Sequence, residues 1–198
     1  MIVEIFQICK ESLNLKENFI RNKELIYLLE TQKIEMEALN KYDGVDLNIF
    51  FNTFVKKVMS LYPEVLKYKY IIGYLVPVYI KGNDKVCDGF AYISQIPKII
   101  VSNYTDVISV LCHELCHLIV YNIVGKGCMV WKTEEILVEL AEYILCKDIL
   151  PPTFLPTNQE IITLYEQYEK NGVIFKDFLL NLCKCINENP NPSAILRD

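Results

Sequence analysis

Two periods of apolar residues divide the chain into helical ends and a middle that contains strands. Residues 14–40 and 47–62 carry apolar side chains at helical spacing among lysines and glutamates, which predicts one or two helices followed by another. The same spacing returns at 159–170 and 174–188, where the Asn171–Gly172 pair supplies the turn between two further helices.

The middle of the chain contains apolar runs that predict strands. The run at 71–80 is rich in isoleucine, valine and tyrosine, and Pro77 within it favours an edge strand or a break. Residues 81–84 predict a turn, and the β-branched run at 96–102 predicts another strand. We therefore expect an α+β fold, with a three- or four-stranded sheet, antiparallel or mixed, inside a largely helical surround.

The composition is that of a folded domain. The chain has 198 residues, of which 52% are hydrophobic, so it can bury a sizeable core. We expect a single domain over residues 1–188, followed by a loose tail at 189–198. Its expected parts are a helical N-terminal part at about 1–66, a core at about 67–150 and a helical C-terminal part at about 151–188.

The net charge and the cysteine content limit the binding partners and the cellular compartment that can be expected for this protein. The net charge of -5 comes without a basic stripe, which argues against a nucleic-acid partner. The first ten residues show no export signal, and no apolar run approaches the ~20 residues of a membrane span, so no membrane association is expected. Eight cysteines without an export signal indicate reduced thiols in the cytoplasm. The sequence gives no signal for an oligomeric state.

The only two histidines form the motif His113-Glu114-Leu115-Cys116-His117. This is the H-E-x-x-H spacing of zinc hydrolases, in which two imidazoles four residues apart on a helix bind one ion and the glutamate acts as a base. The strand at 96–102 precedes the motif, and residues 103–106 supply a turn and a helix N-cap. We therefore predict that His113 and His117 bind Zn²⁺ and that Glu114 is catalytic.

A catalytic zinc usually has three protein ligands and keeps one position open, so a third ligand is required. Because no third histidine exists, a carboxylate is expected, and Cys128 is a further alternative. Residues 131–143 predict a second helix, with Thr133 as its N-cap, and this helix contains four glutamates.

Helical geometry separates these four glutamates. At about 100° per residue, Glu135, Glu139 and Glu142 project to one polar face, which predicts a solvated face. Glu134 instead projects among apolar side chains, as expected for a ligand directed at an ion bound between helices. We therefore choose Glu134 as the third ligand, with Glu135 and Glu139 as the alternatives.

The segment 96–152 resembles the gluzincin metallopeptidases, in which two histidines and one glutamate from a following helix bind zinc. Trp131, three residues before Glu134, is similar to the aminopeptidase-type gluzincins. Glu134, Ala141 and Pro151 are similar to the ImmA/IrrE-type metallopeptidases. The resemblance implies a zincin-like fold and a metallopeptidase activity.

The motif and the resemblance predict a zinc-dependent peptidase. A metal-activated water would attack the peptide bond, with Glu114 as general base. The substrate would be a peptide or protein, bound as an added strand along Phe90–Ser94 or Ile99–Val101. The alternative function is a noncatalytic zincin-like domain with a structural metal or a protein-binding role.

Overall fold

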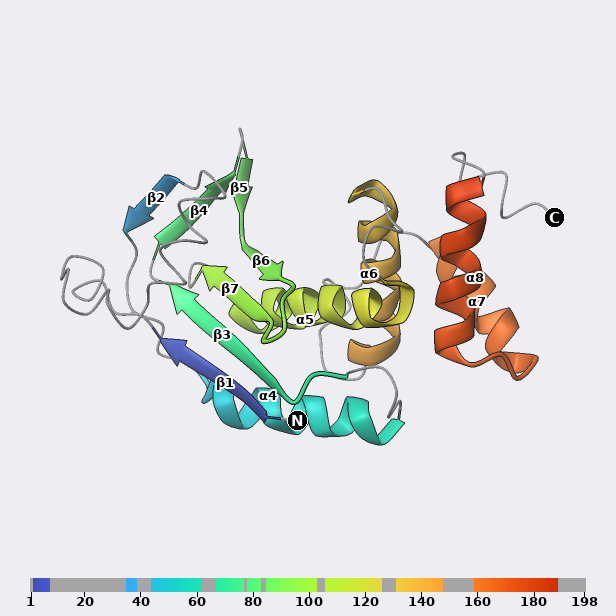
Figure 1. The fold of residues 1–198 in the computed structure, drawn as a ribbon, viewed down its shortest axis with the longest axis horizontal. Coiled ribbons are helices and arrows are strands. Elements are labelled where there is room, and N and C mark those ends of the chain that lie inside the picture. The colour runs from blue at the N-terminus through green and yellow to red at the C-terminus, as the bar shows by residue number, and fades with distance from the viewer. Residues whose placement is uncertain are drawn as a thin grey trace. The chain divides into compact units, whose positions relative to one another are not determined.

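Figure 1 shows the fold of the structure, a computed structural model, as a ribbon. The chain divides into two compact units. One unit is formed by residues 1–56 and 68–114, and the other by residues 57–67 and 115–198. The residues that the structure describes are 2–7, 35–38, 44–61, 67–76, 78–82, 85–102, 106–125, 131–147 and 159–188.

The first unit contains a mixed sheet of four strands in the order β1-β3-β7-β6. Its strands are β1 (Ile2–Gln7), β3 (Tyr70–Val76), β7 (Lys98–Ser102) and β6 (Gly89–Tyr92). The strands β1, β3 and β7 are parallel, while β6 pairs with β7 in the antiparallel direction and forms one edge. The α+β class and the small sheet predicted from the sequence are therefore confirmed.

A second, antiparallel sheet has the order β2-β4-β5. Its strands are β2 (Glu35–Ala38), β4 (Val78–Gly82) and β5 (Lys85–Cys87). The predicted strand at 71–80 is thus two strands in different sheets, since β3 ends at Val76 and β4 begins at Val78. Of the two alternatives expected from Pro77, an edge strand or a break, the break is the one observed. Lys81 and Gly82 belong to β4 rather than to the predicted turn, and Asn83 and Asp84 lie outside the described residues.

The first 40 residues contain two strands that the sequence did not predict. Residues 35–38 form β2, so the predicted helical pattern of 14–40 is wrong there, and the rest of that range lies outside the described residues. The strand β1 was not predicted, although Val3 and Ile5 are buried and Glu4 between them is exposed. This alternation has the period of two that a half-buried strand requires.

The helix α4 (Leu47–Leu61) was predicted at 47–62. Asp46 is its N-cap, because the Asp46 carboxylate accepts hydrogen bonds from the N–H groups of Asn48 and Ile49. Two side chains of α4 bind the outer edge of β1, which is an edge strand of the sheet. The Asn48 amide bonds both the N–H and the carbonyl of Ile5, at 2.7 and 3.1 Å. The Asn52 amide does the same to Val3, at 3.2 and 2.8 Å. This edge of the sheet is therefore covered by side-chain amides.

Replacing Asn52 by alanine is expected to destabilise the fold by about 1–3 kcal/mol, because the partly buried N–H and carbonyl of Val3 lose their partners. Urea unfolding followed by circular dichroism measures this change. Asn181→Ala, at an exposed position of the helix 175–188, is the control and should change stability by less than about 0.5 kcal/mol. Equal effects of the two substitutions would contradict the proposed role of the amide.

The helix α5 (Val107–Val124) carries the histidine motif, and the division between the two units falls within it, after Glu114. Within the segment 103–106, which was predicted to supply a turn and an N-cap, Asp106 is the N-cap, since its carboxylate accepts a hydrogen bond from the N–H of Ser109 at 3.1 Å. Among the described helices, α5 is the one whose length and composition alone would allow it to cross a membrane. Buried core helices share this property, and 61% of α5 is buried within the protein.

The second unit contains the helices α6 (Trp131–Cys146), α7 (Gln159–Lys170) and α8 (Phe175–Glu188). The predicted helices at 159–170 and 174–188 are confirmed. Gly172 ends α7 with a φ of 79°, and hydrogen bonds from Gly172 N–H to Glu169 and from Val173 N–H to Tyr168 close the turn. The helix α6 begins at Trp131, so the prediction that Thr133 is its N-cap is wrong.

Candidate metal centre

The helix α5 brings the polar side chains of the motif into a buried setting. Leu111, Leu115 and Leu118 on this helix are 0–1% exposed, so α5 is packed as a core helix. Within it, Glu114 is 5% exposed and the His117 side chain is 13% exposed. Burying such groups is costly unless they are satisfied by hydrogen bonds, charges or a metal ion. The four-residue spacing directs His113 and His117 to the same side of the helix.

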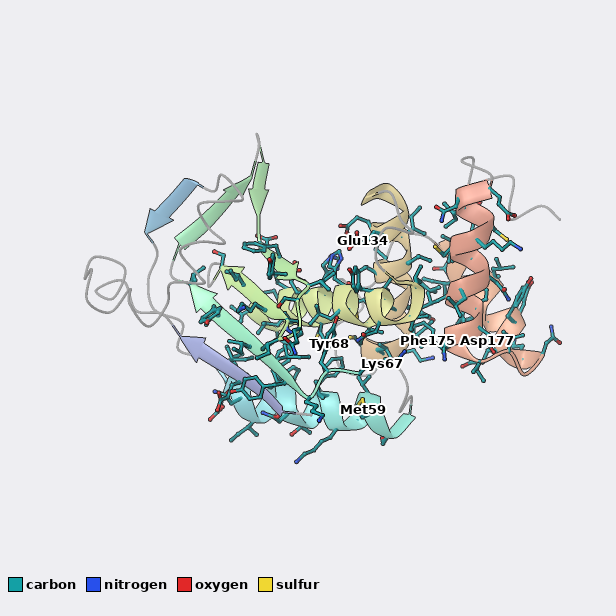
Figure 2. All side chains as sticks on the ribbon, in the orientation of Figure 1. Met59, Lys67, Tyr68, Glu134, Phe175 and Asp177 are labelled. Carbon is teal, nitrogen blue, oxygen red and sulfur yellow. The ribbon has the colours of Figure 1, made fainter. Side chains whose placement is uncertain are left out.

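The start of the helix α6 supplies two carboxylates to His117. Glu134 Oε1 lies 2.9 Å from His117 Nδ1, which is a hydrogen-bond distance. Glu135 Oε1 lies 3.7 Å from His117 Nε2, on the other nitrogen of the same ring. Figure 2 marks Glu134 on α6. The two glutamates are partly buried, with side chains 28% and 30% exposed.

Three of these residues form a cluster with the composition of a metal site. One ligand atom from each of His113, His117 and Glu135 lies within 4.8 Å of the others. Two zinc-bound N or O atoms at 2.0–2.2 Å from a tetrahedral ion are about 3.3–3.6 Å apart, so the 3.7 Å between His117 Nε2 and Glu135 Oε1 is close to that arrangement. Two imidazoles and one carboxylate are also a donor set that zinc accepts in catalytic sites. The three residues therefore lie close enough together to bind a metal ion.

The structure brings together most of the predicted site residues. His113 and His117 share the cluster, Glu114 lies between them on α5, and Glu134 contacts His117 through Nδ1. The third member of the cluster is Glu135, one of the two alternatives to Glu134 that the sequence leaves open, while Glu139 is not part of it. The remaining alternative, Cys128, lies outside the described residues.

The predicted solvated face of α6 is wrong. Glu142 on this face is 6% exposed, and Glu135 and Glu139 are partly buried. The opposite face is buried as well, since Leu137 and Val138 are completely inaccessible. The helix α6 is packed on nearly all sides, so its polar residues do not indicate a solvent-exposed face. The position of a glutamate around this helix therefore does not predict which glutamate binds a metal ion.

The strand β6 lies against α5 beside Glu114. A Cβ atom at Gly89, the first residue of β6, would lie 2.8 Å from Val110 Cγ1, 2.9 Å from the Ile100 carbonyl oxygen and 3.1 Å from Glu114 Cγ. Only glycine fits this approach without movement of its neighbours. Since β6 is an edge of the sheet and β7 is an inner strand, Ile99–Val101 cannot be the open edge.

Gly89→Ala is expected to destabilise the protein by about 1–3 kcal/mol and to displace Glu114, because the carbonyl of Ile100 cannot easily move away. Urea unfolding reports the stability, and the rate of peptide hydrolysis reports the displacement. Gly73→Ala is the comparison: its Cβ would lie 3.0 Å from the Ile5 side-chain atom Cγ1, and the nearest backbone atom, Ile5 Cα, is 3.7 Å away, so a smaller loss of stability is expected. A larger loss of stability or activity in Gly73→Ala would contradict the assigned role of Gly89.

No protein-family model, curated protein or solved structure matches this chain. The residues and their geometry are therefore the basis for assigning a function.

Proposed function

We propose that this protein is a zinc-dependent peptidase with a zincin-like fold of the gluzincin type. The observation that carries the proposal is the cluster of His113, His117 and Glu135, whose ligand atoms lie within 4.8 Å of one another on the helix pair that also bears Glu114. A glutamate next to the first histidine is what a hydrolytic site needs as a base.

In the proposed site, His113, His117 and Glu135 would hold a zinc ion, which is the number of protein ligands usual for a catalytic zinc. Zinc bound there would polarise the scissile carbonyl and lower the pKa of water to about 7. This set contains Glu135 in place of its neighbour Glu134, which the sequence favours as the third ligand. The support for the replacement is that Glu135, not Glu134, faces His117 Nε2.

Glu114 would carry the protons of the reaction. Its carboxylate takes a proton from the water that attacks the peptide carbonyl. It then delivers this proton to the leaving amine, so the peptide bond breaks without a covalent enzyme intermediate. Burial of Glu114, at 5% exposure, limits competition from bulk water for its carboxylate.

A peptide or unfolded protein segment is the substrate that the sheet supports best. Of the two edges of the four-stranded sheet, β1 is covered by the Asn48 and Asn52 amides. The strand β6 at the other edge begins beside Glu114. An extended peptide added to β6 would make main-chain hydrogen bonds and place its carbonyl groups near this base. We propose a cytoplasmic location for this activity, where free cysteines such as the buried Cys112 and Cys116 stay reduced.

Metal analysis of the purified protein tests the proposal. After dialysis against buffered zinc, we expect about one zinc per chain in the wild type and a loss of that zinc in His117→Ala. Elemental mass spectrometry of the acid-digested protein gives the number of zinc ions per chain. A wild type that binds no zinc under these conditions would refute the proposed function.

A further inference from the structure

His117 has a carboxylate next to each of its two ring nitrogens. Glu134 lies at Nδ1, at 2.9 Å, and Glu135 lies near Nε2, at 3.7 Å. These glutamates are consecutive on α6, so their side chains leave the helix about 100° apart and reach the ring from different directions. The two ring nitrogens point away from each other. An ion bound by one nitrogen can therefore be contacted by the carboxylate on that side of the ring, but not by the carboxylate at the other nitrogen.

We propose that the two adjacent glutamates have different roles, with Glu135 as a zinc ligand and Glu134 as a positioning residue for His117. This inference rests on the proposed function. A neutral imidazole has one N–H donor and one acceptor nitrogen, and the hydrogen bond at one nitrogen decides which of them is free. Donation from Nδ1–H to Glu134 leaves the lone pair of Nε2 for the ion.

Partial burial strengthens this contact. The His117 side chain is 13% exposed and that of Glu134 is 28% exposed, so water competes little for the hydrogen bond. The same contact fixes the rotation of the ring, which directs Nε2 to the side where Glu135 lies. Carboxylates that hold the second nitrogen of a ligating histidine raise its basicity and affect metal affinity about 10- to 100-fold.

Zinc affinities of single variants, measured by competition with a chromophoric chelator, test the division of roles. Glu134→Ala should weaken zinc binding about 10- to 100-fold while keeping a saturating stoichiometry of about one. Glu134→Gln should weaken it less, because the amide oxygen still accepts a hydrogen bond. Glu135→Gln should lose more affinity than either, and Glu160→Gln, at an exposed position of α7, should match the wild type. Loss of zinc in Glu134→Gln with retention in Glu135→Gln would overturn the proposal.

A second measurement uses the metal-free protein and separates this inference from the proposed function. The imidazole ¹⁵N shifts of His117 at mildly alkaline pH, where histidine is neutral, report which nitrogen carries the proton. We expect the Nδ1–H form in the wild type and the Nε2–H form, the usual one in solution, in Glu134→Ala. An Nε2–H form in the wild type would refute the role of Glu134 whether or not zinc binds, whereas absence of zinc binding alone would refute the proposed function.

Discussion

Glu114→Gln is expected to reduce peptide hydrolysis about 10²- to 10⁴-fold, which is the usual contribution of a general base. Glutamine keeps the size and shape of the side chain, so the packing around this 5% exposed position is retained. Its amide cannot accept the proton of the attacking water at neutral pH. The measurement is kcat on a mixture of fluorogenic peptides, with zinc stoichiometry and circular dichroism recorded on the same preparations.

The outcome separates an enzyme from a noncatalytic domain. In the enzyme, Glu114→Gln binds as much zinc as the wild type and has lost its activity, while Glu160→Gln at an exposed site retains both. In a noncatalytic domain with a structural metal, Glu114→Gln leaves function intact, because a structural ion needs no base beside it. A variant that keeps the wild-type kcat would therefore exclude Glu114 as the base.

The helices of this protein follow from local sequence signals. The four-residue spacing of apolar positions predicts the helix from Leu47 to Leu61, and Asp106 marks the start of α5. These signals depend on neighbours within one or two turns, so they can be recognised without knowledge of the rest of the fold. The proximity of His113 and His117 is local in the same sense, because one turn of helix separates them.

The short strands depend on distant partners instead. The strand β2 has four residues, Glu35–Ala38, and its partners in β4 lie 40 to 46 residues later in the chain. Its pattern of glutamate, methionine, glutamate and alanine is compatible with a helix, and tertiary pairing decides the outcome. The strand β1 similarly pairs with β3 across a long stretch of chain, and Asn48 and Asn52 hold its other edge.

The choice between Glu134 and Glu135 as the metal ligand likewise depends on contacts between distant parts of the chain. The two residues are adjacent and chemically identical, so composition and motif spacing do not separate them. What separates them is which nitrogen of His117 each approaches. That depends on how α6 packs against the His117 turn, a tertiary contact that helical periodicity does not encode.

Removal of zinc is expected to abolish activity completely while leaving the protein folded. The core does not need the ion for its packing, because Leu115, Leu118 and Ile119 on α5 are fully buried by other side chains. At free zinc about 100 to 1,000 times the Kd, binding would add about 3–4 kcal/mol of stability, which is lost on chelation. Chelator titration, followed by readdition of zinc, measures the activity and the midpoint of urea unfolding.

His117→Ala is the matched control for the chelator, since a protein that holds no zinc should not respond to its removal. We expect the metal-free wild type to keep its helical circular dichroism and to regain full activity when zinc is restored. A structural zinc behaves differently, because its binding free energy is folding free energy and the metal-free chain unfolds. Loss of helicity on chelation would therefore identify the ion as structural, and a folded, inactive and reactivatable protein would identify it as catalytic.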